Sequence, residues 1–506
     1  MGLDHEARLA ALEAQLGQLT DACSRRRLDE HAGHIDETVV DAFFLLVAAV
    51  GVFSMQQGFA MLEVGSCAKD HTKEILLKNI MDIAIGAASW WIVGHAIANG
   101  DDSFRNSGAN GVFGTSGFGY INAATVGKPG FGGQAEWFFG LSFAATSATI
   151  VSGAIAERCN MIPYFLLACL LTAFVYPVVA HVAWHESGRL SAYRDERLAF
   201  GCGLLDFAGG GVVHLTGGVA ALAAAWSVGP RDNKYTSRGD PVPMRQQSVV
   251  LQVLGTLTLW LGWFAFNGGS VLSASRAGIA AHCCFTTTLS GAAACLSTGV
   301  FFYATKRRVD PAAACNGILA GLVAITPGCA TSNALGAMFT GLVAGPLYGA
   351  SAHFVEYKLR IDDVCSAVSV HATCGMWGLI AAALFATPRY YDAAYETSRG
   401  QRCMGAFYGG NGNSLAAAIV FILLDAAWVA VPVLGLFAVM KRTCGVRSDF
   451  GGRTSDSELD SSKHGDVILP TSVKMPGSAE LRAAAGSDDS ILDGLAPAGG
   501  ISEAKS

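Results

Sequence analysis

The segment DFAGGGVVHLTGG runs from Asp206 to Gly218, and the segment DVCSAVSVHATCG, from Asp363 to Gly375, repeats its pattern. Both copies obey D-x6-V-H-x-T-x-G, which aligns His214 with His371. Each histidine falls in an apolar stretch of membrane-spanning length. An ionisable side chain inside a membrane is costly, so by default it marks a site or a pathway. Two histidines at equivalent positions therefore indicate one site built from two halves.

The rest of the sequence is also strongly apolar. Of its 506 residues, 52% are hydrophobic and only 15% are charged. A helix needs roughly 20 apolar residues to cross a bilayer, and about eleven stretches meet that requirement. They lie near residues 39–62, 76–98, 136–156, 161–185, 207–228, 248–267, 278–304, 311–326, 334–357, 366–386 and 414–440. No soluble domain has an interior for so many apolar helices, and the 61 glycines favour close helix packing in a membrane. The sequence therefore predicts an all-α polytopic membrane protein with eleven transmembrane helices.

The two copies of the histidine motif fall in the fifth and the tenth of these stretches. Because five is an odd number, the second block of five must enter the membrane from the opposite side. This pattern predicts a five-plus-five inverted repeat, with a peripheral eleventh helix and a site near the midplane between the repeats. A weaker match links Gly58–Ser66 in the first stretch to Trp263–Ser270 in the sixth.

The charged residues gather in the loops and at both ends of the chain. We expect an extracellular N-terminal segment with a short heptad helix (1–38), a membrane domain (39–442) and a cytoplasmic, regulatory, largely disordered tail (443–506). The heptad positions suit a coiled coil or an amphipathic surface helix equally, and they are Leu9, Leu12, Leu16 and Leu19. Basic residues are more frequent in the loops on the side of the C-terminus, so the positive-inside rule predicts the N-terminus outside and the C-terminus inside.

Composition also limits the partners. The net charge is -6, and no basic stripe with interleaved aromatic residues is present, so we expect no nucleic-acid partner. The 14 cysteines lack a C-x-x-C or zinc-type spacing, which argues against a disulfide framework and a metal site, with Cys23 the one candidate for a disulfide. We expect no cofactor.

Two neutral imidazoles that share a hydrogen bond leave one nitrogen at each end for a small polar ligand or a water. Such a pair can also exchange protons near neutral pH. Metal binding by His214 and His371 lacks a third ligand at matching spacing. Bis-histidine haem ligation is the alternative from the enzyme class. A histidine can also have a purely structural role, with a hydrogen bond to a helix carbonyl in the core. We favour this alternative for His95, His181 and His282.

Aromatic residues stand next to glycine and serine near the ends of several stretches. They are Phe139, Phe143, Trp184, Trp263 and Phe266. Rings so placed can form a cation–π cage for a small cation such as ammonium. They also serve as packing or as interface anchors in most membrane proteins.

The sequence resembles the Amt/Mep/Rh ammonium transporter family, in order and with consistent spacing from about residue 39 to residue 442. The resemblance is carried by FAATSATIVSGAIAER (143–158), DFAGGGVVH (206–214), GWFAFNGGS (262–270) and VHATCGMWG (370–378). The segment FSMQQGFAML (53–62) is similar to the plant-type branch.

The resemblance implies a homotrimer with one pore per subunit, in a plasma membrane, acting in nitrogen uptake as a high-affinity-type transporter of ammonium and methylammonium and not as an enzyme. The resemblance also implies that membrane lipid surrounds the protein. The implied roles follow the pore: Phe139, Trp184 and Ser270 for recruitment, Phe143 and Phe266 for the gate, His214 and His371 for the pore, and Asp206 for structure and proton release. In the tail, DSSKHG (460–465) is similar to the plant-type regulatory segment, which implies a kinase as partner and Ser462 as its phosphosite.

Two positions depart from the family pattern. Ser366 stands where many members carry an acidic residue, and Ala372 follows His371 where glycine is usual. Ser366, together with the long serine-rich tail, keeps open an ammonium sensor with little flux. A channel for neutral NH3 or CO2 is a further alternative.

Overall fold

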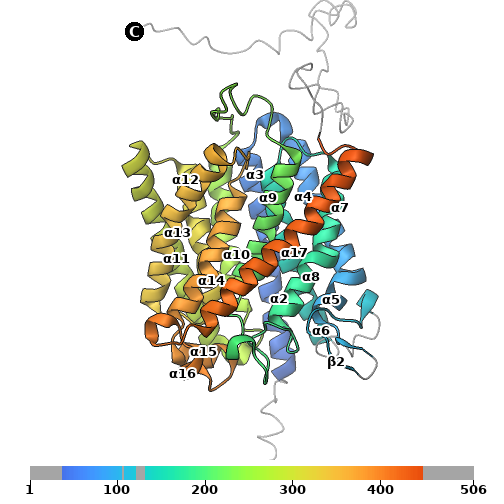
Figure 1. Cartoon of the computed structure of the whole chain (residues 1–506), viewed down its shortest axis with the longest axis vertical. Coiled ribbons are helices and arrows are strands. Elements are labelled where there is room, and N and C mark those ends of the chain that lie inside the picture. The colour runs from blue at the N-terminus through green and yellow to red at the C-terminus, as the bar shows by residue number, and fades with distance from the viewer. Residues whose placement is uncertain (1–36, 105–106, 121–130, 448–506) are drawn as a thin grey trace, which may run out of the picture. The chain divides into compact units, whose positions relative to one another are not determined.

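The computed structural model describes residues 37–104, 107–120 and 131–447. These residues form a bundle of long helices (Figure 1). The predicted heptad helix, Cys23 and Ser462 lie outside the described residues, and the domain boundaries at 38/39 and 442/443 stay predictions.

The helices and the two short strands follow one another along the chain in this order. They are α2 (Glu37–Phe53), α3 (Met55–Ser66), α4 (Thr72–Ser89), α5 (His95–Asn99), β1 (Ser103–Phe104), β2 (Ser107–Ala109), α6 (Phe131–Ile155), α7 (Met161–Leu170), α8 (Tyr176–Trp184), α9 (Thr216–Val228), α10 (Val249–Gly269), α11 (Ala277–Lys306), α12 (Pro311–Ile325), α13 (Ala334–His353), α14 (Cys374–Phe385), α15 (Pro388–Tyr395), α16 (Gly400–Cys403) and α17 (Asn413–Thr443). Five π-helical segments join or extend them: η2 (Trp90–Gly94), η5 (Leu171–Val175), η7 (Gly210–Leu215), η10 (Phe354–Lys358) and η11 (Val368–Thr373). The strands β1 and β2 pair antiparallel in a loop.

Within the described residues, ten helical stretches are long and apolar enough to cross a membrane. They coincide with ten of the eleven predicted spans. The ninth predicted span corresponds to α13, a 20-residue helix that is not among the ten and contains Pro346. The chain enters α2 at one end of the bundle and leaves α17 at the other (Figure 1). An odd number of crossings is needed for that arrangement, which supports α13 as an eleventh span, although the count of eleven stays a prediction.

The two halves of the sequence meet along the helices that contain the histidine motif. Helix α3 packs on α10, α9 on η11, and α14 on η7, so the first and fifth spans contact the sixth and tenth. The final glycine of each motif copy lies at this contact. A Cβ at Gly218 would collide with the backbone of Ala372, and one at Gly375 would lie 2.7 Å from the carbonyl oxygen of Gly210. Glycine is therefore required for the two histidine-bearing segments to approach each other.

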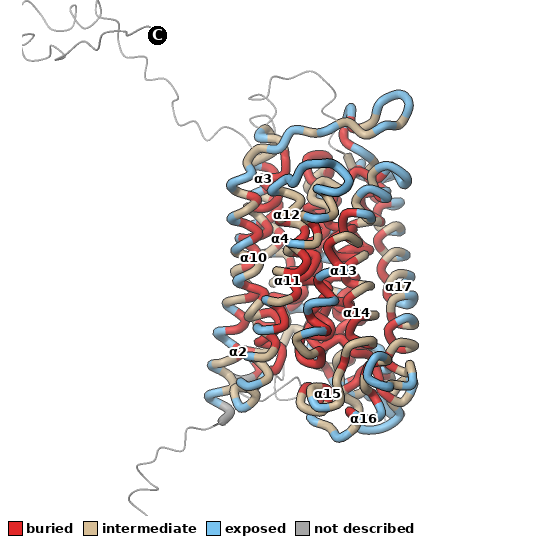
Figure 2. Tube along the Cα trace, turned by 90° about the vertical axis from the view of Figure 1, so that its left-hand side faces the viewer, coloured by how far each residue is buried: buried red, intermediate tan, exposed pale blue. Residues whose placement is uncertain are grey.

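Burial is distributed as expected for a bundle in lipid. The buried residues lie along the inside of the bundle, whereas α2, α10 and α17 alternate between buried and exposed positions (Figure 2). Large apolar side chains are exposed on the outer faces, for example Phe43, Leu261, Leu296, Val300 and Val431. A helix that is apolar on its outer face as well as its inner face is typical of a membrane protein.

One disulfide was not predicted from the sequence. Cys202 and Cys403 are bonded across a sequence separation of 201 residues. They connect the loop after α8 to α16, at the end of the bundle opposite the C-terminus of α17 (Figure 1). Neither cysteine belongs to a recognisable spacing pattern, so only the tertiary structure reveals the pair.

Candidate functional site

The two motif histidines meet in the interior of the bundle. The Nδ1 atoms of His214 and His371 lie 3.2 Å apart, with 0% and 5% of the residues exposed. Because a neutral imidazole carries one N–H, one ring must donate this bond and the other must accept it. The pair therefore presents one Nε2 donor and one Nε2 acceptor at its two ends. Within the described residues, Nε2 of His214 has no hydrogen-bond partner.

Each histidine is positioned by the aspartate that opens its motif. Asp206 accepts hydrogen bonds from the backbone N–H groups of Gly209, Gly211 and Val212 at 3.1, 3.0 and 2.8 Å. These N–H groups belong to the start of η7, where no helical carbonyl precedes them. The carboxylate thus caps the π-helical segment whose fifth residue is His214. A π-helical turn inside a helix is often found at functional sites.

The second motif copy repeats this arrangement. Asp363 accepts from the backbone N–H groups of Ala367 and Val368 at 2.9 and 2.7 Å, at the start of η11. The predicted pseudo-symmetry is therefore present at the level of individual hydrogen bonds. The structure also explains the spacing, since an aspartate eight residues before the histidine caps the segment that contains it.

An aromatic stack leads to the histidine pair. Phe143 and Phe266 are stacked, with ring centroids 4.0 Å apart and planes at 16°. The ring centroids of Phe139 and Phe143 lie 4.7 Å apart, and those of Phe266 and His214 lie 5.4 Å apart. All three phenylalanines are buried. The residues predicted as the gate are therefore in direct contact, and their ring contacts link Phe139 to His214.

The two other predicted recruitment residues differ in how they face this stack. The Trp184 ring meets Phe143 edge-on at 6.0 Å, and its indole N–H donates to the carbonyl oxygen of Asp206 at 2.7 Å. Ser270 lies just after α10, and its hydroxyl donates to the carbonyl oxygen of Phe266 at 2.7 Å. The serine is thus one turn from the stacked ring, with its hydroxyl proton already used by the backbone.

Trp263 is part of the site rather than a membrane-interface anchor. Its ring stacks on His214 with centroids 4.9 Å apart and planes at 13°. Its indole N–H donates to the Thr326 hydroxyl at 2.9 Å. This bond fixes the indole, so the tryptophan forms a rigid wall against one face of the imidazole.

A buried polar cluster beside the pair was not predicted from the sequence. Glu63 accepts from Asn79 and Ser152 at 3.0 and 2.9 Å, and Asp82 accepts from Thr149 at 2.6 Å. These side chains come from α3, α4 and α6, and all are buried. Their spacing along the chain is irregular. The sequence signals that pointed to them were Asp82 inside the predicted span 76–98 and Glu63 directly after the predicted span 39–62.

Glu63 also shares a small cavity with the histidine pair. A cavity of about 20 Å³ is lined by Glu63 and His371, among other residues. Such a volume has room for a single water molecule. The Oε1 atom of Glu63 has no hydrogen-bond partner among the described residues. A polar group is therefore available beside His371.

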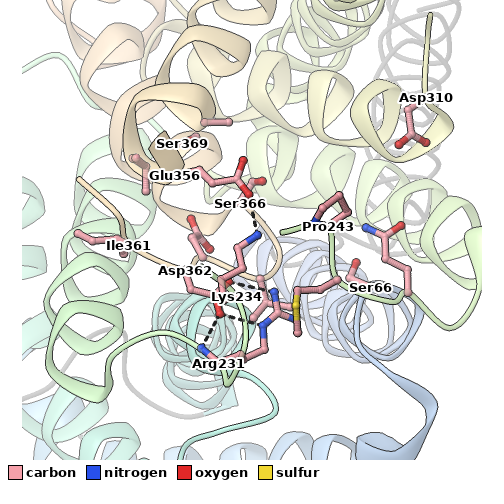
Figure 3. A pocket seen from close by; sticks show the side chains of 16 residues that line it. Ser66, Arg231, Lys234, Pro243, Asp310, Glu356, Ile361, Asp362, Ser366 and Ser369 are labelled. Atoms are coloured by element: carbon pink, nitrogen blue, oxygen red, sulfur yellow. Dashed lines mark hydrogen bonds and ion pairs between the residues drawn. The ribbon is translucent and has the colours of Figure 1, made fainter. Parts of the chain in front are cut away.

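A larger polar cavity of about 340 Å³ opens at the end of the bundle where α17 ends. Figure 3 shows its lining, which includes Asp362 directly before the second motif copy and Asp363, Ser366 and Ser369 within it. Its cationic side chains are already paired. Arg231 binds Asp362 through two nitrogen–oxygen contacts of 2.8 and 2.9 Å.

Ion pairing keeps the acidic and basic side chains of this cavity in their charged forms. Burial by itself would raise the pKa of Asp362, but the hydrogen bonds and charge of Arg231 outweigh burial and hold the pKa below its ordinary value. Burial would likewise lower the pKa of Arg231, and the Asp362 carboxylate reverses this and raises it. Both groups thus remain charged at neutral pH. Lys234 is paired in the same way, with Glu356 at 2.6 Å.

Of the three lone histidines, His181 makes the expected hydrogen bond to a helix carbonyl, and His282 bonds a carbonyl in the loop before α13. His181 Nδ1 lies 3.0 Å from the carbonyl oxygen of Ala98, and His282 Nε2 lies 2.8 Å from that of Ser332. His95 differs, because its Nδ1 is bonded to the Asn99 side chain at 3.1 Å instead of a carbonyl.

Comparison with known proteins matches this architecture. The model of the Ammonium Transporter Family matches residues 42–468. Ammonium transporter Amt2 of Archaeoglobus fulgidus is 36% identical over 443 residues, covering 86% of this chain and 90% of the relative. Ammonium transporter 1 member 3 of Solanum lycopersicum is 36% identical over 455 residues, covering 86% and 94%.

Solved structures of similar proteins superpose on this fold. The structure titled Sensor Amt Protein superposes with a TM-score of 0.72 at 31% identity, covering 84% of this chain and 96% of that one. Mep2 of Saccharomyces cerevisiae gives a TM-score of 0.71 at 25% identity, covering 83% and 90%.

The helical bundle, its inverted repeat and the buried histidine pair define a polytopic membrane protein with a site between its two halves. With a family model over most of the sequence and relatives at 36% identity, the chain belongs to the Ammonium Transporter Family.

Proposed function

We propose that the chain transports ammonium across a membrane by releasing a proton near the aromatic stack and passing ammonia along the histidine pair. The observation that carries this proposal is the hydrogen-bonded pair of buried imidazoles directly below a closed stack of phenylalanine rings. A narrow apolar path with one shared proton at its centre suits a small molecule that both donates and accepts hydrogen bonds.

Recruitment takes place at Phe139, Trp184 and Ser270. The ring faces attract a small cation electrostatically, by about 0.5–2 kcal/mol per favourable contact. The Ser270 hydroxyl donates to a backbone carbonyl, so its oxygen lone pairs remain to accept from an ammonium N–H. The site therefore offers an acceptor and π-faces in place of lost water.

The stacked rings of Phe143 and Phe266 are the gate, and they make deprotonation favourable. Moving an ion into a dry apolar passage costs several kcal/mol or more. Ammonium escapes this cost by leaving its proton behind, whereas potassium has no proton to lose. The gate thus selects against potassium by desolvation rather than by size.

The histidine pair conducts ammonia and, separately, the proton. A shift of the shared proton between the two Nδ1 atoms exchanges the donor and acceptor ends of the pair. Asp206 contributes by capping η7 and by placing a carboxylate near the stack, where it assists proton release. Methylammonium, which has the same acidic N–H, is a second substrate.

We further propose a homotrimer in a plasma membrane, with the N-terminus outside and the C-terminus in the cytoplasm. The basic loop residues support this orientation. The Cys202–Cys403 disulfide supports it as well, because it lies at the end assigned to the oxidising outside. The tail is proposed as a regulatory segment, with a kinase acting on Ser462.

A sensor is the second candidate function. One similar solved structure is titled Sensor Amt Protein, and Ser366 stands in the polar cavity in a left-handed backbone conformation, with φ of 60°. A sensor binds ammonium and passes little of it.

The test is radiolabelled methylammonium uptake by proteoliposomes that contain the purified chain, beside ligand binding to the same sample. The transporter proposal expects saturable uptake that unlabelled ammonium competes away and that His214→Ala reduces at least tenfold. Binding without uptake above empty liposomes would instead establish the sensor.

A further inference from the structure

Three metal-ligating side chains meet at the end of α8, outside the site described above. Asp102, His181 and His185 each offer a ligand atom, and these atoms lie within 4.8 Å of one another. Asp102 follows α5 and is distant in sequence from the two histidines, which are four residues apart. The transport path does not use any of the three. The four-residue spacing of His181 and His185 is visible in the sequence, but Asp102 lies 79 residues before His181, so only the structure brings the three together.

The hydrogen bonds of His181 fix which of its nitrogens faces the aspartate. Its Nδ1 lies 3.0 Å from the carbonyl oxygen of Ala98, which accepts only, so Nδ1 carries the proton. In the neutral ring Nε2 is then a bare lone pair, and it faces Oδ2 of Asp102 at 3.4 Å. Two acceptors that face each other are brought together by a shared cation, which is either a proton on Nε2, giving a His181–Asp102 ion pair, or a metal ion.

This arrangement matches the usual surroundings of a metal-binding histidine, which donates its other N–H to a carbonyl or carboxylate. The separation also fits. Two ligands about 2.0–2.1 Å from a tetrahedral zinc ion are about 3.3–3.4 Å apart, which is the Nε2–Oδ2 distance. Both residues are buried, with 0% and 3% exposed.

The Asp102 carboxylate is held in place by further donors. Its Oδ2 accepts from the backbone N–H of Gly111 at 2.6 Å and from the Ser187 hydroxyl at 2.8 Å. Hydrogen bonds of this kind orient a carboxylate ligand and are important for metal affinity. The second histidine is bonded to the same serine, with His185 Nδ1 and Ser187 Oγ 2.6 Å apart.

His185 completes the cluster from its solvent edge. Its ring is stacked on that of His181, with centroids 4.2 Å apart and planes at 13°. Parallel rings cannot direct their lone pairs at one ion, so ligation turns the His185 ring out of the stack and breaks its bond to Ser187. His185 is the least buried of the three and follows the last helical residue, which leaves its side chain room to turn.

We propose that Asp102, His181 and His185 bind a divalent transition-metal ion of the zinc type, with water in the remaining position. Two histidines four residues apart and a carboxylate are a donor set that zinc, nickel and copper prefer, whereas calcium and magnesium need oxygen ligands. Trp184 lies between the two histidines in sequence. The ion therefore ties the segment after α5 to the end of α8, beside the proposed recruitment site.

The experiment is zinc titration of the full-length chain in detergent, stripped with a chelator, by isothermal calorimetry. The proposal expects one zinc ion per chain with micromolar or tighter affinity, weakened at least tenfold by Asp102→Asn and by His185→Ser. His282→Ser is the matched control, because His282 lies outside the cluster, and it should bind zinc as the unaltered chain does. Cobalt in place of zinc should give the visible absorbance of a tetrahedral site.

Two outcomes would overturn the proposal. One is no saturable zinc binding by the unaltered chain. The other is affinity unchanged in both cluster variants while each elutes as a folded protein. If Asp102→Asn misfolds, His185→Ser still tests the proposal, because His185 is at the solvent edge and its replacement should leave the fold intact. Methylammonium uptake by His185→Ser without metal should equal that of the unaltered chain, which separates a failure here from a failure of the transport proposal.

Discussion

Replacing Asp206 by asparagine tests how the histidine-bearing segment is held. The carboxylate accepts three backbone N–H groups, those of Gly209 on Oδ1 and of Gly211 and Val212 on Oδ2. Asparagine has the same shape but only one acceptor oxygen, and its amide group carries protons of its own. At least one N–H group must therefore face another donor.

The magnitude follows from these contacts. A hydrogen bond to a charged group contributes about 1.5–3 kcal/mol, and a buried N–H left without a partner costs about 1–3 kcal/mol. Because Asp206 is only 2% exposed, water cannot replace the lost acceptor. We expect Asp206→Asn to destabilise the chain by about 2–5 kcal/mol and to reduce methylammonium uptake at least tenfold, as η7 shifts and moves His214.

The assay is heat unfolding in detergent, followed by intrinsic fluorescence, together with uptake at equal surface expression. Asp310→Asn is the matched control. Asp310 is an exposed cap that accepts from the N–H of Ala312 at 3.1 Å, and asparagine caps helices about as well as aspartate. The control should unfold at the temperature of the unaltered chain. If Asp206→Asn also did so, with normal uptake, the inference that this carboxylate organises the histidine segment would be wrong.

Three further predictions concern other parts of the path. Phe266→Ala removes the stacked ring under Phe143, and we expect a potassium current that the unaltered chain lacks; continued exclusion of potassium would refute the desolvation gate. Trp184→Phe keeps an aromatic ring but loses the indole hydrogen bond, which contributes about 1 kcal/mol. The KM for methylammonium should therefore rise about fivefold with little change in maximal rate. An unchanged KM would count against recruitment of the substrate at Trp184. Asp362→Asn leaves Arg231 buried without its main partner and should cost about 3–5 kcal/mol. The fold depresses the pKa of Asp362, so the stabilisation by this carboxylate is complete above its ordinary pKa of about 3.9 and is lost as the pH falls through the folded pKa. The difference in unfolding temperature between the variant and the unaltered chain should therefore shrink over that pH range. A constant difference would contradict the ion pair.

The histidine pair was predictable because the motif is repeated. Equivalent positions in two inverted halves must approach each other, and D-x6-V-H-x-T-x-G also contains the capping aspartate and the contact glycine. The aromatic residues were predictable as candidates only, since the same rings serve as anchors in many membrane proteins. The contact of Phe143 with Phe266 required the structure.

The features that sequence reasoning missed join segments with no shared pattern. Glu63 and Asn79 come from different helices, Asp102 and His181 from different segments, and Cys202 pairs with Cys403 across 201 residues. Each pair depends on how helices cross in three dimensions. Local spacing determines helices and caps, but it does not determine which distant side chains those helices bring together.

The most direct test of charge-coupled transport is the current that ammonium pulses evoke in voltage-clamped oocytes expressing the chain, beside His214→Ala and His371→Ala. Charge-coupled transport through the histidine pair predicts a saturable inward current in the unaltered chain, and its loss or a change in ion selectivity in both variants at equal surface expression. Methylammonium uptake without any current, or an unaltered current in both histidine variants, would contradict it.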